Sequence, residues 1–164
     1  MNSGDNSLVT AVSIQMRAEV LFYSDNSLKG VLYSQYLNKP FEFSSLIQMI
    51  EKMEDIFDVK SFPQAFMTPR VFKTTGNTNN RTHELDGNID MKDKLNPMTH
   101  PESSSTKCTF EISVKFRQNA TWQGQILWAE KNAKQNFRSV LEMLKLMDEA
   151  IAESGGQSEP IAWG

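Results

Sequence analysis

Hydrophobic and polar residues alternate along one segment in the second half of the chain. From Cys108 to Phe116 every second residue is apolar, and the residues between them are polar. This period of two predicts a half-buried strand. A return strand carries Trp122, Ile126 and Trp128 on the same parity. We therefore expect both tryptophans to lie on the covered face of a hairpin.

The same pattern occurs earlier in the chain, because residues 16–57 align with residues 110–151 without a gap at an offset of 94. Eight of the 42 aligned pairs are identical and several others keep their character, with chance similarity as the alternative. We predict an α+β fold of two duplicated strand–hairpin–strand–helix units, packed as an intramolecular pseudo-dimer. The predicted parts are a first unit with its following segment at 8–72, a polar flexible linker at 73–107, a second unit at 108–153 and a loose tail at 154–164.

Each hairpin places a phenylalanine near a glycine if its loop has three residues. A loop of Asn119, Ala120 and Thr121 sets Phe116 opposite Gly124 and Val114 opposite Ile126. The corresponding loop, Asp25 to Ser27, sets Phe22 opposite Gly30. An aromatic ring above a glycine would explain both pairs, and a bulge at each glycine is the alternative.

A helix follows each hairpin. Ser45 and Ser139 each stand three residues before a Gln or Glu, which is the spacing of a capping box. Both helices then carry an apolar stripe with methionines, which predicts core packing rather than an adaptable binding groove. The stripes comprise Leu46, Met49, Ile50, Met53 and Phe57 in the first helix, and Val140, Met143, Leu144, Met147 and Ile151 in the second.

Residue types that carry catalysis are scarce. His83 and His100 are the two histidines of the chain, and both fall in the polar linker. The run that starts at Asp86 resembles a calcium loop but has Met91 where the turn needs glycine and Pro97 where a carboxylate must close the site. Cys108 has the inward parity of its strand, which predicts a buried hydrophobe rather than a nucleophile. We therefore expect no enzyme activity, no cofactor and no metal site.

Net charge is −3, so a generally basic nucleic-acid protein is disfavoured, but the second unit has a local excess of basic residues. On a sheet face, such residues bind phosphate groups or simply remain solvated. The candidate nucleic-acid surface consists of Lys115, Arg117, Lys131, Lys134 and Arg138.

The outward face of the first unit is less polar than its counterpart. Four apolar or aromatic side chains on two strands would form one exposed patch, and such patches are usually covered. A partner protein, a second copy or another part of this chain could cover it. The candidate partner surface consists of Leu21, Tyr23, Val31 and Tyr33.

Compartment signals are few. A single cysteine excludes an intrachain disulfide and favours a reducing compartment. The first 20 residues lack the pattern of a signal peptide, and no apolar run is long enough to cross a membrane. We expect a cytoplasmic protein without a membrane partner.

Several segments resemble a family of small uncharacterised proteins of anaerobic Firmicutes. They are Thr121 to Gly124, Ile126 to Trp128, Phe137 to Asp148 and Phe62 to Phe66. The resemblance covers most of the chain outside the linker. It implies a shared fold and assigns no activity and no site residues to this chain.

Together these features predict a non-catalytic protein-binding protein, an adaptor or inhibitor. Small bacterial proteins of this kind include inhibitors of phage-defence systems, which makes such a role a hypothesis for this chain. The expected partner is another protein or a second copy. The alternative is a nucleic-acid-binding module that uses the basic sheet face of the second unit.

Overall fold

The computed structural model describes residues 13–24, 27–63, 89, 108–118 and 121–154. Six strands and two α-helices make up these parts, which confirms the α+β class. In chain order they are β1 (Ile14–Ser24), β2 (Ser27–Tyr33), β3 (Phe41–Phe43), α1 (Leu46–Lys60), β4 (Cys108–Phe116), β5 (Gln123–Trp128), the 3-10 helix η1 (Ala129–Lys131), β6 (Ala133–Phe137) and α2 (Val140–Glu153).

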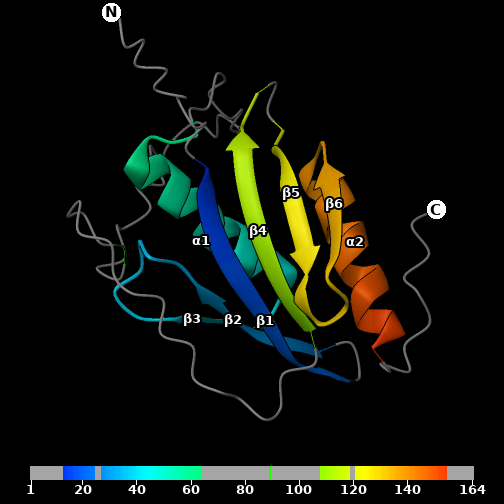
Figure 1. Ribbon diagram of the computed structural model, residues 1–164. Coiled ribbons are helices and arrows are strands. Elements are labelled where there is room, and N and C mark those ends of the chain that lie inside the picture. Colours follow the sequence, from blue (N-terminus) through cyan, green and yellow to red (C-terminus); the bar gives the residue numbers. More distant parts are fainter. Residues whose placement is uncertain (1–12, 25–26, 64–88, 90–107, 119–120, 155–164) are drawn as a thin grey trace, which may run out of the picture.

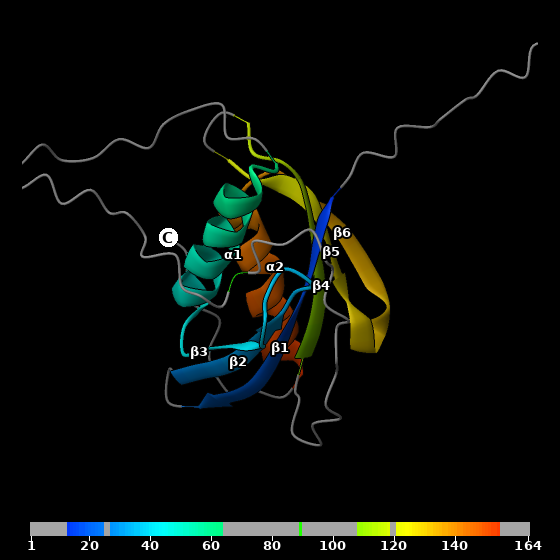
Figure 2. The same cartoon turned by 90° about the vertical axis from the view of Figure 1, so that its left-hand side faces the viewer.

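The strands form one antiparallel sheet in the order β3-β2-β1-β4-β5-β6. Both helices lie against the same face of this sheet. Its other face, called the open face below, is turned toward the viewer in Figure 1 and has no helix or strand of the described residues packed on it. Figure 2 shows the two layers from the side. The long strands β1 and β4 pair with each other and so join the first half of the sheet, β1 to β3 with α1, to the second half, β4 to β6 with α2. Arg17 lies opposite Glu111 at the middle of this paired stretch. Strands β3 and β6 are the two edges.

Those edge strands follow from segments that the sequence pattern predicted only as short extended pieces before each helix. Phe43 at the end of β3 pairs with Gly30, and Phe137 at the end of β6 pairs with Gly124. Each glycine lies beneath the ring of this phenylalanine. A Cβ atom at Gly30 would be 2.3 Å from the Phe43 ring, and one at Gly124 would be 3.0 Å from the Phe137 ring.

The core between sheet and helices contains the predicted methionine stripes, because Met49, Met53, Met143 and Met147 are all fully buried. Both predicted capping boxes form. The Ser45 and Ser139 side chains accept hydrogen bonds from the backbone N–H groups of Gln48 and Glu142. Those two side chains in turn accept from backbone N–H groups that precede the helices.

The predicted hairpin registers are wrong. Val114, not Phe116, lies opposite Gly124, and Ile126 lies opposite Ile112. In the first hairpin Val20 lies opposite Gly30 and Phe22 opposite Lys29. Two differences add up. The connections do not have the predicted three-residue length, since Ser24 pairs with Ser27 and Phe116 with Gln123, which shifts each register by one residue. A β-bulge in each long strand, between Val20 and Phe22 and between Val114 and Phe116, shifts it by one more. An extra residue in one strand changes both the register and the face to which later side chains point.

That change of face is visible at the end of β4. Phe116, predicted to point inward, is 47% exposed, while Arg117, predicted to point outward, is 6% exposed. The pattern before the bulge is as predicted, with Phe110, Ile112 and Val114 buried.

One residue between the two halves belongs to the core. Ile89, which falls in the segment predicted as a flexible linker, is buried and forms an antiparallel bridge with Leu37. The rest of that segment, and the tail after Ser154, lie outside the described residues. An apolar contact in this connection therefore ties it to the first half of the sheet.

Candidate functional site

A hollow of about 270 Å³ lies between the end of the sheet and helix α2. Strand β6 forms one side of its opening, and α2 forms the other. Its lining combines buried apolar residues of β4 and β5 with polar residues at the rim. The lining residues are Phe110, Ile126, Trp128, Lys131, Ala133, Gln135, Leu146, Glu149, Ala150 and Glu153.

Small side chains leave this space unfilled. Ala133 on β6 and Ala150 on α2 each contribute only a methyl group to the lining. Phe110 and Ile126 are buried, and Trp128 and Leu146 are partly buried against the core. The hollow is therefore apolar inside and suits an apolar group of moderate size.

Charged side chains surround the opening. Lys131 forms an ion pair with Glu153, and its Nζ lies 5.0 Å from the centre of the Trp128 ring. Glu149 adds a second carboxylate at the rim. The Trp128 Nε1 atom is buried and has no hydrogen-bond acceptor among the residues that the structure describes.

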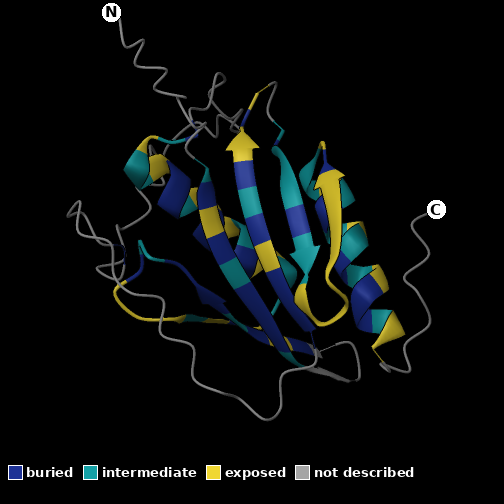
Figure 3. Ribbon diagram, viewed as in Figure 1, coloured by how far each residue is buried: buried dark blue, intermediate teal, exposed yellow. Residues whose placement is uncertain are grey.

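Strand β6 is an exposed sheet edge beside the hollow. Ala133 to Asn136 are all exposed, as the yellow strand in Figure 3 shows. Its neighbour is β5 on one side, and no strand among the described residues pairs with its other side. Every second backbone N–H and C=O group of such an edge is available to another chain.

The candidate partner surface of the first half is less exposed than the sequence predicts. Tyr33 is buried, and Leu21 and Val31 are half-buried. Tyr23 pairs with Leu28 in the hairpin, and its side chain lies outside the described part. These strands therefore present no large open apolar patch at the described positions.

A polar network accompanies Tyr33 on this face. Glu19 is buried there, 3.1 Å from the Arg17 guanidinium. Burial, and then the charge of Glu19, raises the pKa of the Tyr33 hydroxyl. The middle of the same open face has a shallow polar groove of about 240 Å³, lined by Arg17, Glu111 and Lys134 among others.

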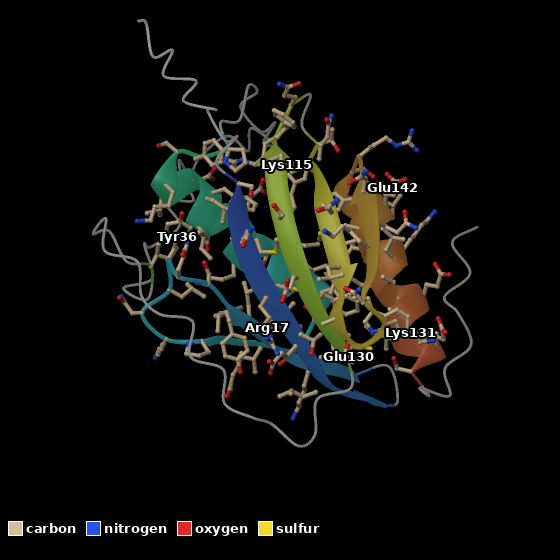
Figure 4. All side chains as sticks on the ribbon, in the orientation of Figure 1. Arg17, Tyr36, Lys115, Glu130, Lys131 and Glu142 are labelled. Atoms are coloured by element: carbon tan, nitrogen blue, oxygen red, sulfur yellow. The ribbon has the colours of Figure 1, made fainter. Side chains whose placement is uncertain are left out.

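The five residues of the candidate nucleic-acid surface do not lie on one face. Lys115 and Lys131 are at opposite ends of the sheet (Figure 4). Lys131 is paired with Glu153 at the hollow, and Arg138 is paired with Glu142 at the start of α2. Lys134 is exposed on β6. Only Lys115 and Lys134 of this set remain on the open face of the sheet.

Arg117, the fifth member, is held by helix α1 on the covered face. Its guanidinium donates to Asp58 Oδ1 at 2.8 Å and to the Pro63 carbonyl oxygen at 2.6 Å. It also lies 5.3 Å from the centre of the Phe57 ring. The prediction that Arg117 lies beside Lys115 on the outer face is wrong, because the bulge before it reverses the alternation.

Cys108 and the two histidines, the residues considered for catalysis, do not line the hollow or lie outside the described part. Cys108 is fully buried, and its thiol lies 3.1 Å from Ser154 Oγ. His83, His100 and the run from Asp86 fall outside the described residues, except for the core residue Ile89. In the parts that the structure describes, no three His, Cys, Asp or Glu side chains gather as metal ligands. Neither described helix is long and apolar enough to cross a membrane.

Sequence reasoning missed the hollow, although a signal for it exists. At the offset of 94, Leu37 corresponds to Lys131 and Phe41 to Gln135, so apolar residues of the first half become polar in the second. Trp128, predicted to lie on the covered face, forms a wall of this space. Comparison of the chain with known protein families, curated proteins and solved structures gives no significant match.

Proposed function

We propose that the protein is a non-catalytic binding protein that engages another protein, as an adaptor or inhibitor. The observation that supports this function best is the position of the exposed β6 edge directly beside the apolar hollow. An edge strand supplies backbone hydrogen bonds to any extended segment, and an adjacent hollow selects among side chains. Together they make a site for a protein segment rather than for a small polar substrate.

The geometry of strand addition explains how both features act on one segment. Side chains of an added strand alternate between the two faces of the sheet. Ala133 and Gln135 line the hollow, whereas Lys134 between them does not. Every second side chain of the segment would therefore be directed toward α2 and the hollow.

We also propose that the two halves arose by duplication and pack as a pseudo-dimer about the β1–β4 pair. Three features recur at the offset of 94 residues: the bulge, the serine cap and the glycine–phenylalanine pair. Arg17 and Glu111, which face each other at the middle of this pair, are also 94 residues apart. Under this proposal the second half carries the binding site and the first half supports it.

A blocking substitution tests the proposed binding function. Ala133→Phe places a ring in the hollow from an exposed position of β6, so the fold should tolerate it. Ala129→Phe is the matched control, because Ala129 is also exposed but does not line the hollow. Partners are captured from a lysate of the native host with the full chain, identified by mass spectrometry, purified and titrated against each variant.

We expect Ala133→Phe to weaken binding by at least about tenfold, since a blocked site loses its central apolar contact. The Ala129→Phe variant should bind like the wild type. Equal binding by all three proteins would refute the proposed site. Affinity that falls steeply with added salt and depends on nucleic acid would instead favour the nucleic-acid alternative.

A further inference from the structure

The first half of the sheet shows how this fold receives a side chain from a separate segment. Leu37, which corresponds to Lys131 at the rim of the hollow, forms an antiparallel bridge with Ile89. Both residues are buried in the core. At the position that corresponds to Lys131, therefore, a strand-like contact brings one aliphatic side chain from a separate segment into the core.

We infer that the hollow in the second half accepts one aliphatic side chain from an extended segment of another protein, with a basic residue two positions away in that segment. The inference rests on the proposed function and specifies the chemistry of the partner. The aliphatic side chain would enter between β6 and α2. The basic residue would lie at the carboxylates of α2.

The apolar part follows from the lining. Phe110 and Ile126 are buried residues that line the hollow, and Trp128 and Leu146 line it beside them. A branched aliphatic group fits a space of about 270 Å³ and buries apolar surface without a polar group that needs a partner.

The basic part follows from charge. Lys131 and Glu153 neutralise each other, and Glu149 has no ion pair within the described residues. The rim therefore has a net charge of −1, which a lysine or arginine complements. Residues two positions apart in a strand point to the same face, so the anchor and the basic residue can reach α2 together.

Charge also distinguishes two possible occupants of the hollow, a segment of another protein and residues 155–164 of this chain. Residues 155–164 contain Ile161 and Trp163, but Glu159 is their only charged side chain. An acidic segment does not complement an acidic rim. A segment of another protein that carries a basic residue satisfies both requirements.

Fluorescence anisotropy with labelled nine-residue peptides and the full chain tests the inference. The reference peptide has alternating threonines, a central isoleucine and a lysine two residues later. One matched peptide replaces the isoleucine with serine, and another replaces the lysine with glutamate. The protein variants are Ala133→Phe, its control Ala129→Phe, and Trp163→Ala.

We expect the serine peptide to bind at least about tenfold more weakly, since it loses the buried side chain. The glutamate peptide should bind about threefold more weakly at low salt, with the difference reduced at high salt. The Ala133→Phe variant should lose binding of the reference peptide, and the Ala129→Phe variant should keep it.

Three results would overturn the inference. The first is equal binding of the isoleucine and serine peptides, or binding of neither. The second is a dimer in sedimentation that Ala133→Phe dissociates, which would assign the hollow to a second copy. The third is an affinity that rises about tenfold in Trp163→Ala, which would assign the hollow to the end of this chain. None of them removes the proposed function, which depends on the purified partner and its sensitivity to Ala133→Phe.

Discussion

The two halves of the sheet end alike, in an edge strand beside a helix, but the residues between strand and helix differ in kind. In the first half the corresponding positions carry Leu37, Phe41 and Ile56, which are buried or packed against the core. In the second half they carry Lys131, Gln135 and Ala150. The same backbone frame thus surrounds apolar side chains in one half and a hollow in the other.

This difference shows how one fold can combine a filled core in one half with an open hollow in the other. Burial of large apolar side chains stabilises the first half. Ile89, which lies outside the named strands and helices, contributes a further buried side chain. The second half buries less apolar surface at the corresponding positions, because it has lysine, glutamine and alanine there instead of leucine, phenylalanine and isoleucine. Because β1 and β4 pair along their length, the first half can support the second.

The largest effect is expected from the residue that ties the second half to α1. Arg117→Ala should lower the free energy of unfolding by about 3 kcal/mol, because the Pro63 carbonyl would lose its buried donor and the Phe57 ring its contact with the guanidinium, whereas Asp58 is mostly exposed and would remain solvated. Urea denaturation measures this change. Lys115→Ala, at an exposed site two residues away, should change it by less than about 0.5 kcal/mol. Equal effects of the two substitutions would contradict the buried position of Arg117.

The next prediction compares the apolar half with the open half directly. Ile89→Ala should lower the free energy of unfolding by about 2 kcal/mol, since a buried isoleucine is truncated in the core. Leu146→Ala should have a smaller effect, because Leu146 is only partly buried at the hollow. Urea titrations of both variants test the order. A larger loss at Leu146 would show that the space around it is already filled.

The two glycines provide a matched pair. A Cβ atom at Gly124 would lie 2.0 Å from the backbone oxygen of Ser113, whereas the closest atom at Gly30 is in the Phe43 ring at 2.3 Å. A Cβ atom at Gly30 would also lie 2.7 Å from the backbone oxygen of Glu19. Alanine at either position should destabilise by about 1–3 kcal/mol, with the larger effect at Gly124, because its backbone contact is the shorter one and a ring can move more easily than a paired backbone. Thermal unfolding of Gly124→Ala and Gly30→Ala measures the difference. The reverse order would indicate that the sheet adjusts more readily than the core around Phe43.

The smallest effect concerns the helix caps, which differ in charge. Hydrogen bonds from Arg138, first from its backbone N–H at 2.7 Å, lower the pKa of Glu142. This contribution to stability is therefore present above the unfolded pKa of about 4.3 and is lost as the pH falls through the lower folded value. The melting temperature of the wild type should therefore fall with decreasing pH through this range relative to that of Glu142→Gln, and the two should follow the same pH dependence once Glu142 is protonated in the folded protein.

The first half contains the matched control for that measurement, because Gln48 makes the same contact to the Ser44 N–H without a charge. Gln48→Glu should introduce a weak acid dependence there. If neither substitution changes how the melting temperature depends on pH, protonation of a carboxylate at the cap does not affect stability.

Local signals in the sequence predicted much of the secondary structure. The alternation from Cys108 to Val114, the two serine caps and the methionine stripes are all present as predicted. They were readable because each depends on neighbours within a few residues. The registers and the face of Arg117 were not, because a single inserted residue in a strand reverses all later positions and leaves no fixed sequence pattern.

The candidate site at the hollow was also predictable only in part, but for another reason than the strand registers. Lys131 and Lys134 were identified as basic residues, but their grouping with Lys115 depended on a flat sheet with uniform alternation. The hollow combines residues of β4, β5, β6 and α2, and its volume depends on how far the helix lies from the sheet edge. No local pattern encodes that distance.

The sequence by itself determined which segments form strands and helices, where the helices begin and which methionines enter the core. These features depend on hydrophobic periodicity and on capping within single turns. Tertiary structure alone decided that β1 pairs with β4, that Ile89 reaches Leu37, and that β6 is an open edge beside a hollow. Such contacts join residues distant in the chain, and their geometry is set by packing across the whole sheet rather than by any one segment.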